Sequence, residues 1–154
     1  MGTWNTFWRL NAHSRRVVVS VSCVMVASRV GLRVAGYRRW IALLARWSAH
    51  AGGGLYPDNL RPHPVPGQLA LLTAAAARNL LFKPTCLERS IGLWWLLRRH
   101  GFGAEIRIGG RKATHQFEAH AWVECGGLVL DTSSDQQGSF SVFEDSRPVA
   151  KEVR

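Results

Sequence analysis

Hydrophobic side chains recur at helical spacing over most of the first hundred residues. The pattern predicts helices over about 17–34 and 37–49, the first ending at Gly36. The apolar run 17–27 alone is too short to span a bilayer. A third helix, rich in Ala and Leu, is predicted over about 67–82 and is expected to be buried on most sides. The second helix is predicted to be amphipathic. Its apolar face holds Tyr37, Trp40, Ile41, Leu44 and Trp47, and off that face lie Arg38, Arg39 and Arg46.

A fourth helix begins near Cys86 and carries the broadest apolar stripe in the chain. Thr85 is a good N-cap, and Glu88 three residues later completes a capping box. The stripe is so wide that we expect this helix to be buried on most sides, ending at Gly101. Cys86 therefore lies in the first turn, where free backbone N–H groups and the helix dipole favour a thiolate, the nucleophilic form of cysteine. The alternative is a small buried hydrophobic residue, which is the commoner role of a free cysteine.

After Gly101 the hydrophobic period changes from helical to alternating. Strands are predicted over 104–108, 117–124 and 128–131, with a possible short strand at 140–143. The glycines and basic residues at 109–112 are expected to form a turn, and 126–127 a second turn. Helices first and strands afterwards indicate an α+β fold with a small antiparallel sheet.

The charge of the chain is concentrated near its start. Residues 1–57 contain eight Arg and no acidic residue, whereas the remaining 97 contain twelve Lys and Arg against ten acids. We expect this basic region to receive a partner, or to make peripheral contact with an anionic membrane. A scaffold that binds nucleic acid is disfavoured, since no DNA- or RNA-binding module is visible.

Three cysteines, Cys23, Cys86 and Cys125, form an odd and sparse set. Such a set indicates reduced thiols and a cytoplasmic location, with membrane association left open, and not a disulfide framework. No CxxC pair or phosphate-binding loop is present, so neither a metal site nor a cofactor is expected.

A base and an acid for Cys86 follow from the predicted hairpin. With a two-residue turn at 126–127, paired residue numbers sum to 253, which places His120 and Asp131 on one face as diagonal neighbours. In that arrangement His120 would take the proton from Cys86, and Asp131 would orient the imidazole. Asp135 has the same parity as Asp131 and stays open, although Asp131 directly ends the strand. A structural histidine and a turn aspartate are the alternative interpretations.

These motifs resemble a known family. Cys-Leu-x-Arg-Ser at a helix start, then His-Ala-Trp-Val-Glu and Leu-x-Leu-Asp, are similar to the transglutaminase-like cysteine proteases of lasso peptide biosynthesis, the leader peptidases often termed lasso B proteins. The resemblance covers about residues 80–135 and implies a transglutaminase/papain-like core with Cys86, His120 and Asp131 as the catalytic triad. It also implies removal of the leader from a ribosomally made precursor peptide, followed by ring closure by an ATP-dependent lasso cyclase.

The chain departs from the family in two respects. Larger members carry an N-terminal leader-recognition domain, and we expect none here, so the resemblance implies the peptidase half of the split form and a small separate leader-binding protein. Ordinary transglutaminases often have Trp beside the cysteine, whereas Thr85 and Leu87 stand here, which disfavours cross-linking. Acyl transfer to an amine, as by a transglutaminase or acetyltransferase, remains the chemical alternative. The expected organisation is a basic helical region and Pro-rich linker (1–66), a peptidase core (67–145) and a frayed tail (146–154).

Overall fold

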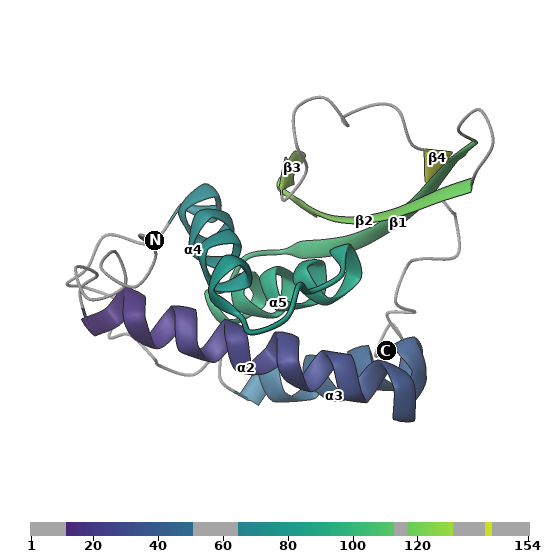
Figure 1. Ribbon diagram of the computed structural model, residues 1–154. Helices are drawn as coiled ribbons and strands as arrows, with labels where there is room; N and C mark the ends of the chain where they lie inside the picture. Colours follow the sequence, from purple (N-terminus) through teal and green to yellow (C-terminus); the bar gives the residue numbers. More distant parts are fainter. Residues whose placement is uncertain (1–11, 51–64, 113–116, 131–140, 143–154) are drawn as a thin grey trace, which may run out of the picture.

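The computed structural model describes residues 12–50, 65–112, 117–130 and 141–142. They form α2 (Ala12–Val34), α3 (Gly36–His50), α4 (Pro66–Asn79), α5 (Cys86–Arg99), β1 (Ala104–Lys112), β2 (Phe117–Cys125), β3 (Leu128–Leu130) and β4 (Ser141–Val142). The strands pair antiparallel in the order β3-β2-β1-β4, and the helices lie together on one side of the sheet (Figure 1). The α+β class predicted from the sequence is confirmed.

Helix α5 is the centre of the core, as its wide apolar stripe predicts. Every residue from 91 to 97 is buried. Its side chains form one hydrophobic cluster with residues of α2, α3, α4, β1 and β2, so all the long elements share a single core. Gly92 lets α2 approach closely, because a Cβ there would lie 3.1 Å from both Met25 Cγ and Val21 Cγ2.

The ends of α5 are set by a capping box and a glycine, both of which can be predicted from the sequence. Thr85 accepts a hydrogen bond from the Glu88 backbone N–H at 3.2 Å, and the Glu88 carboxylate accepts one from the Thr85 N–H at 2.8 Å. The predicted capping box is therefore confirmed. At the other end the chain leaves the helix through Gly101, whose φ of 80° favours glycine. The buried indole of Trp94 then donates a hydrogen bond to the Ala104 carbonyl at 3.1 Å, which fastens α5 to the start of β1.

Helices α2 and α3 form a hairpin through Gly36 (φ 74°). The Trp40 indole packs onto Gly31 and donates a hydrogen bond to Ser28 Oγ at 3.0 Å. The prediction that Trp47 belongs to the buried face of α3 is wrong, since this side chain is 61% exposed. The buried line of α3 runs through Ile41, Leu44 and Ser48, which are spaced by three and four residues, so Ser48 and not Trp47 takes the buried position in the last turn.

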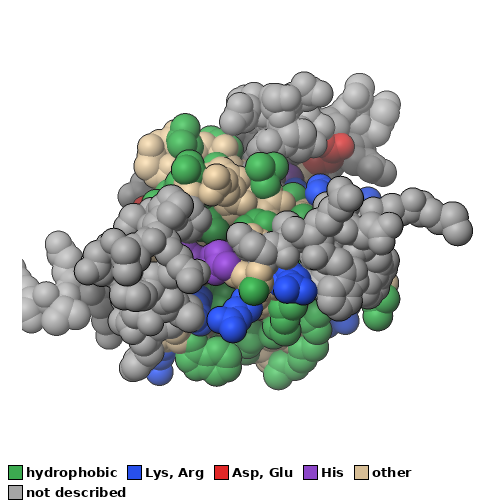
Figure 2. Space-filling model, turned by 90° about the vertical axis from the view of Figure 1, so that its left-hand side faces the viewer, with side chains coloured by type: hydrophobic (Ala, Val, Ile, Leu, Met, Phe, Trp, Pro, Cys, Tyr) green, Lys and Arg blue, Asp and Glu red, His purple; other side chains and the backbone are tan. Residues whose placement is uncertain are grey.

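Helix α2 has the length and apolarity to cross a membrane, although many of its residues are buried against neighbouring helices. A core helix of a soluble protein passes the same test. In Figure 2, hydrophobic and basic side chains lie next to one another in the lower half of the molecule, the part that holds α2 and α3 in Figure 1.

Helix α4 differs from its prediction in extent and burial. It ends at Asn79, and Leu80 is already extended, so the helix does not reach Phe82. Only one face is buried, by Leu69, Thr73 and Ala76, and Leu71 is 72% exposed. Alanine-rich helices are apolar all round yet have little area to bury, so composition alone overstates how far they are enclosed.

The predicted turn at 109–112 is also wrong, because β1 continues through both glycines to Lys112. Gly109 and Gly110 are buried and pair with His120 and Ala119 of β2. The second predicted turn is confirmed. Gly126 (φ 56°) and Gly127 (φ 80°) are both left-handed, as a two-residue hairpin turn requires.

Candidate active site

Cys86 is the first residue of α5, directly after the N-cap Thr85. Its thiol is half-buried, whereas Cys23 on α2 is exposed and Cys125 on β2 is buried, and all three are free. The Cys86 thiol thus combines partial access with the positive end of a helix dipole. Neither of the other two cysteines has both features.

His120 lies near the middle of β2, where it is half-buried and its Nε2 atom is inaccessible to solvent. Its partner on β1 is Gly109, so β1 places no side chain beside the imidazole on that face. The ring instead stacks on Trp122, with centroids 6.2 Å apart and planes inclined by 17°. The sharing of one face by His120 and Trp122, predicted from strand alternation, is confirmed.

The register of the hairpin agrees with the sequence as far as the structure describes it. Cys125 pairs with Leu128 and Val123 with Leu130, so the pair numbers sum to 253. Asp131 and Asp135, the two candidates for the acid, lie outside the described residues. Their roles stay predictions. Within the described ranges, no group of three His, Cys, Asp or Glu side chains could hold a metal ion.

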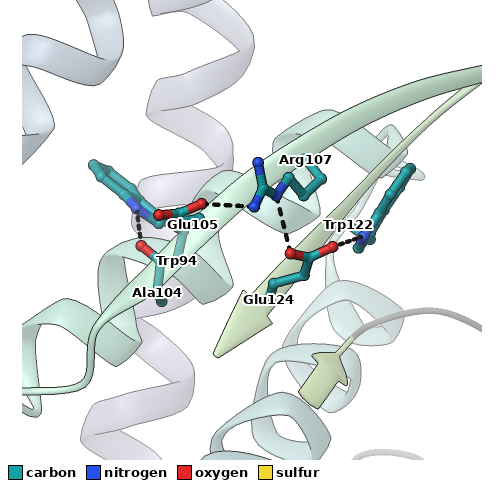
Figure 3. Close-up of polar contacts among 6 residues, drawn as sticks. All are labelled: Trp94, Ala104, Glu105, Arg107, Trp122 and Glu124. Atoms are coloured by element: carbon teal, nitrogen blue, oxygen red, sulfur yellow. Dashed lines mark hydrogen bonds and ion pairs between the residues drawn. The ribbon is translucent and has the colours of Figure 1, made fainter. Parts of the chain in front are cut away.

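A chain of polar contacts runs across the same face of β1 and β2 (Figure 3). The Arg107 guanidinium contacts Glu105 at 3.0 Å and donates through Nε to Glu124 Oε2 at 2.9 Å. The other Glu124 oxygen accepts a hydrogen bond from the Trp122 indole at 3.1 Å. Because Trp122 stacks on the imidazole, this chain holds the neighbour of His120 in a fixed orientation.

The two faces of β2 have different surroundings. Val123 and Cys125 join the core cluster that includes the apolar side chains of α5, and His120 and Trp122 lie on the opposite face. Trp122 is nevertheless buried. Strand alternation alone therefore does not pair the imidazole with Cys86, because His120 lies on the face of β2 opposite to the one that packs in the core with α5.

Sequence reasoning missed the parts played by Arg107 and Glu124. Both residues lie within the strands predicted over 104–108 and 117–124, but no part in the site was predicted for either. Glu124 is separated from His120 by an even number of residues on the same strand, so strand alternation alone could have placed its side chain on the face of His120. The β1–β2 register, in which Arg107 stands opposite Trp122, was not predicted, since the expected turn at 109–112 would have shortened β1.

A cysteine at a capped helix start, packed with an antiparallel sheet that carries a histidine, is the framework of papain-like acyl-transfer enzymes. The sequence pattern of the transglutaminase-like superfamily matches residues 31–145, and the chain belongs to this superfamily. It is also similar to the microcin J25-processing protein McjB of Escherichia coli, with 34% identity over 65 residues. That alignment covers 42% of this chain and 30% of McjB, so the chain spans less than a third of that relative.

The two similarities bear out the resemblance to lasso peptide processing proteins that the motifs indicated. No solved structure matches the chain.

Proposed function

We propose that this protein is a cysteine peptidase that removes the leader from a ribosomally made lasso precursor peptide. Cys86 is the nucleophile, His120 the base and Asp131 the group that orients the imidazole. The observation that carries the proposal is the position of Cys86 at the capped start of α5, a helix that packs against the strand bearing His120, in a chain of the transglutaminase-like superfamily. Each residue type suits its role.

The path of α5 along the sheet supports the pairing of Cys86 with His120. The Trp94 indole donates a hydrogen bond to the Ala104 carbonyl, and Ala104 pairs with Cys125 in the sheet. The part of α5 that holds Trp94 therefore lies at the C-terminal end of β2. From Trp94 back to Cys86 the helix covers about 12 Å, and from Cys125 back to His120 the strand covers about 17 Å. Figure 1 shows α5 running antiparallel to β1, and thus in the same direction as β2. The start of α5 therefore lies toward the middle of β2.

The chemistry follows from these groups. The Cys86 thiolate attacks the carbonyl carbon of the scissile peptide bond, and the Cys86 backbone N–H is a candidate donor to the oxyanion. The imidazolium of His120 gives its proton to the leaving amine, which is the N-terminus of the core peptide. Water, deprotonated by His120, then hydrolyses the thioester and frees the leader with a new carboxylate.

The substrate class rests on the similarity to a protein named for microcin J25 processing. The same similarity leads us to propose a small separate leader-binding protein that delivers the precursor, and a lasso cyclase that uses the freed amine. Transfer of the acyl group to an amine instead of water is the second candidate. It is favoured by the superfamily match, because a thioester does not determine which nucleophile resolves it.

The test is incubation of the protein with the co-encoded precursor peptide, with and without the leader-binding protein, followed by mass spectrometry. Hydrolysis gives a leader with a free carboxylate and a core peptide with a free amine. An amine such as putrescine, added to a parallel sample, distinguishes the alternatives. A leader carrying the amine as an amide even at low amine concentration would favour the transferase, and an unchanged precursor would remove both candidates.

A further inference from the structure

Helix α2 has a second apolar face that no described part of the chain covers. Val19, Cys23, Val26, Val30 and Val34 follow one another at intervals of three or four residues, so they form one stripe along the helix. All five are exposed, and Val34 is 82% exposed. The opposite face of α2 is buried in the core. We refer to these five residues as the valine stripe.

Helix α3 extends this apolar surface. Trp40, Leu43 and Trp47 recur along one side of α3, and Trp40 contacts α2 at Gly31 and Ser28. Leu43 and Trp47 therefore lie on the side of α3 nearest to α2, and both are exposed. A tryptophan at such a position has an apolar ring and a polar N–H, a combination suited to the boundary between lipid and water.

The charge around this surface has a single sign. Arg16 and Arg33 on α2 lie three residues from Val19 and Val30, and Arg39 on α3 lies four residues from Leu43, so these exposed arginines flank the apolar side chains. No Asp or Glu occurs between residues 1 and 57. Figure 2 shows basic and hydrophobic side chains intermingled in the lower half of the molecule, whereas the visible acidic side chains lie at the top.

We propose that the valine stripe, Leu43, Trp47 and the flanking arginines dock the protein onto an anionic lipid bilayer. Exposed apolar side chains enter the headgroup boundary while arginines bind lipid phosphates, the combination that holds amphipathic helices in the membrane plane. Helix α2 lies in that plane and does not cross the bilayer, because its other face is part of the protein core. A nucleic acid would use the arginines but would leave the valines exposed to water, so lipid is the better fit.

The experiment measures co-sedimentation of the full chain with vesicles of phosphatidylcholine, with and without phosphatidylglycerol. We expect binding only to the anionic vesicles, weakening as salt is raised, because the arginine contribution is screened. Arg33→Gln with Arg39→Gln should weaken binding about thirtyfold, as expected for the loss of two interfacial charges. Val26→Glu with Val30→Glu should weaken it at least as much, since carboxylates cannot enter the boundary. Matched controls are Arg78→Gln with Lys83→Gln, and Leu71→Glu with Leu81→Glu, at residues exposed elsewhere.

Circular dichroism checks that each variant is folded, and Cys86→Ala should bind vesicles as the wild type does, which separates this proposal from the peptidase assignment. Full vesicle binding by the Val26→Glu, Val30→Glu variant would overturn the proposal. So would a wild type that ignores anionic vesicles but uses these residues to bind the leader-binding protein, because the surface would then be a protein interface.

Discussion

Glu124 links the side chains of Arg107 and Trp122 next to His120 in the candidate site. One of its oxygens binds Arg107 and the other accepts from the Trp122 indole, whose ring stacks on His120. Glu124→Gln replaces the carboxylate with an amide that binds both partners less strongly. Because the ion pair is partly exposed, the cost in stability should be only about 0.5–1 kcal/mol. Precursor cleavage should fall several-fold in kcat with little change in KM, since the imidazole loses a fixed neighbour.

Glu105→Gln is the matched control, because Glu105 contacts the same guanidinium but not Trp122. Glu105→Gln should lower the free energy of unfolding by a similar amount and leave kcat and KM of precursor cleavage unchanged. Equal kinetic effects of the two substitutions would mean that the polar contacts serve only the sheet.

The choice of acid is a second question at the scale of single residues. The register that sums to 253, found between β2 and β3, extrapolates to place Asp131 opposite Trp122 and diagonal to His120. Asp131→Asn should keep the fold but lower turnover sharply, about a thousandfold or more, because an amide stabilises the imidazolium poorly and selects the wrong tautomer. Asp135→Asn should be mild. The reverse ranking in steady-state cleavage would assign the role to Asp135.

At the scale of elements, the relation of α5 to β2 decides whether a thiol and an imidazole meet. A disulfide forms only between cysteines whose Cα atoms lie within about 7 Å. With Cys23 and Cys125 replaced by Ser and Ala, His120→Cys should cross-link to Cys86 under mild oxidation, which non-reducing electrophoresis and peptide mapping detect. Ala121→Cys, on the opposite face of β2, is the control and should remain free. Preferential cross-linking of the Ala121→Cys variant would contradict the proposed pairing of Cys86 with the residue at position 120.

The contact between α2 and α3 gives a prediction about stability. A Cβ on Gly31 would lie 2.3 Å from the Trp40 ring, so Gly31→Ala must displace that indole and its hydrogen bond to Ser28. The free energy of unfolding should fall by about 1–3 kcal/mol. Gly67→Ala, where nothing lies within 4 Å of the added Cβ, should be neutral or stabilising. Urea denaturation compares them, and an unaffected Gly31→Ala variant would contradict this packing.

The sequence predicted best those elements whose signals are local. The capping box of Thr85 and Glu88 and the turn at Gly126 and Gly127 each depend on a few neighbouring residues, and both are present. A turn was predicted at Gly109 and Gly110 because glycine is common in turns, and a glycine pair inside a strand looks the same in the sequence. The two glycines are held in an extended conformation by their pairing with His120 and Ala119 of β2. That pairing is a long-range feature, so the sequence around the glycines does not indicate it.

The candidate site shows the same division. Cys86 was proposed from its helix start and His120 from the alternation of its strand, and both of these local features are present, while the catalytic roles stay predictions. Arg107 was not connected to Glu124, because that contact depends on the register of two long strands. The exposure of Trp47 was missed for a related reason, since neighbouring helices decide which side of α3 is buried.

At the scale of the whole molecule, chemistry and basic charge occupy different parts of one fold. Residues 1–57 contribute eight arginines without an acid, whereas the polar contacts beside His120 lie in the sheet. Yet α2 and α3 share their hydrophobic cluster with α5, so the helix that carries Cys86 is held by the helices that carry the arginines. The surface proposed to bind a membrane and the candidate site thus share one hydrophobic cluster.

The peptidase assignment is tested most directly by one comparison of precursor cleavage, followed by mass spectrometry. The variant Cys23→Ser, Cys125→Ala keeps Cys86 as the sole thiol, because the chain has three cysteines. With the leader-binding protein present, it should release the free leader and core at close to the wild-type rate, and Cys86→Ala should release neither while remaining folded. Cleavage by pure, folded Cys86→Ala, or loss of cleavage in a folded variant that retains only Cys86, would contradict the account.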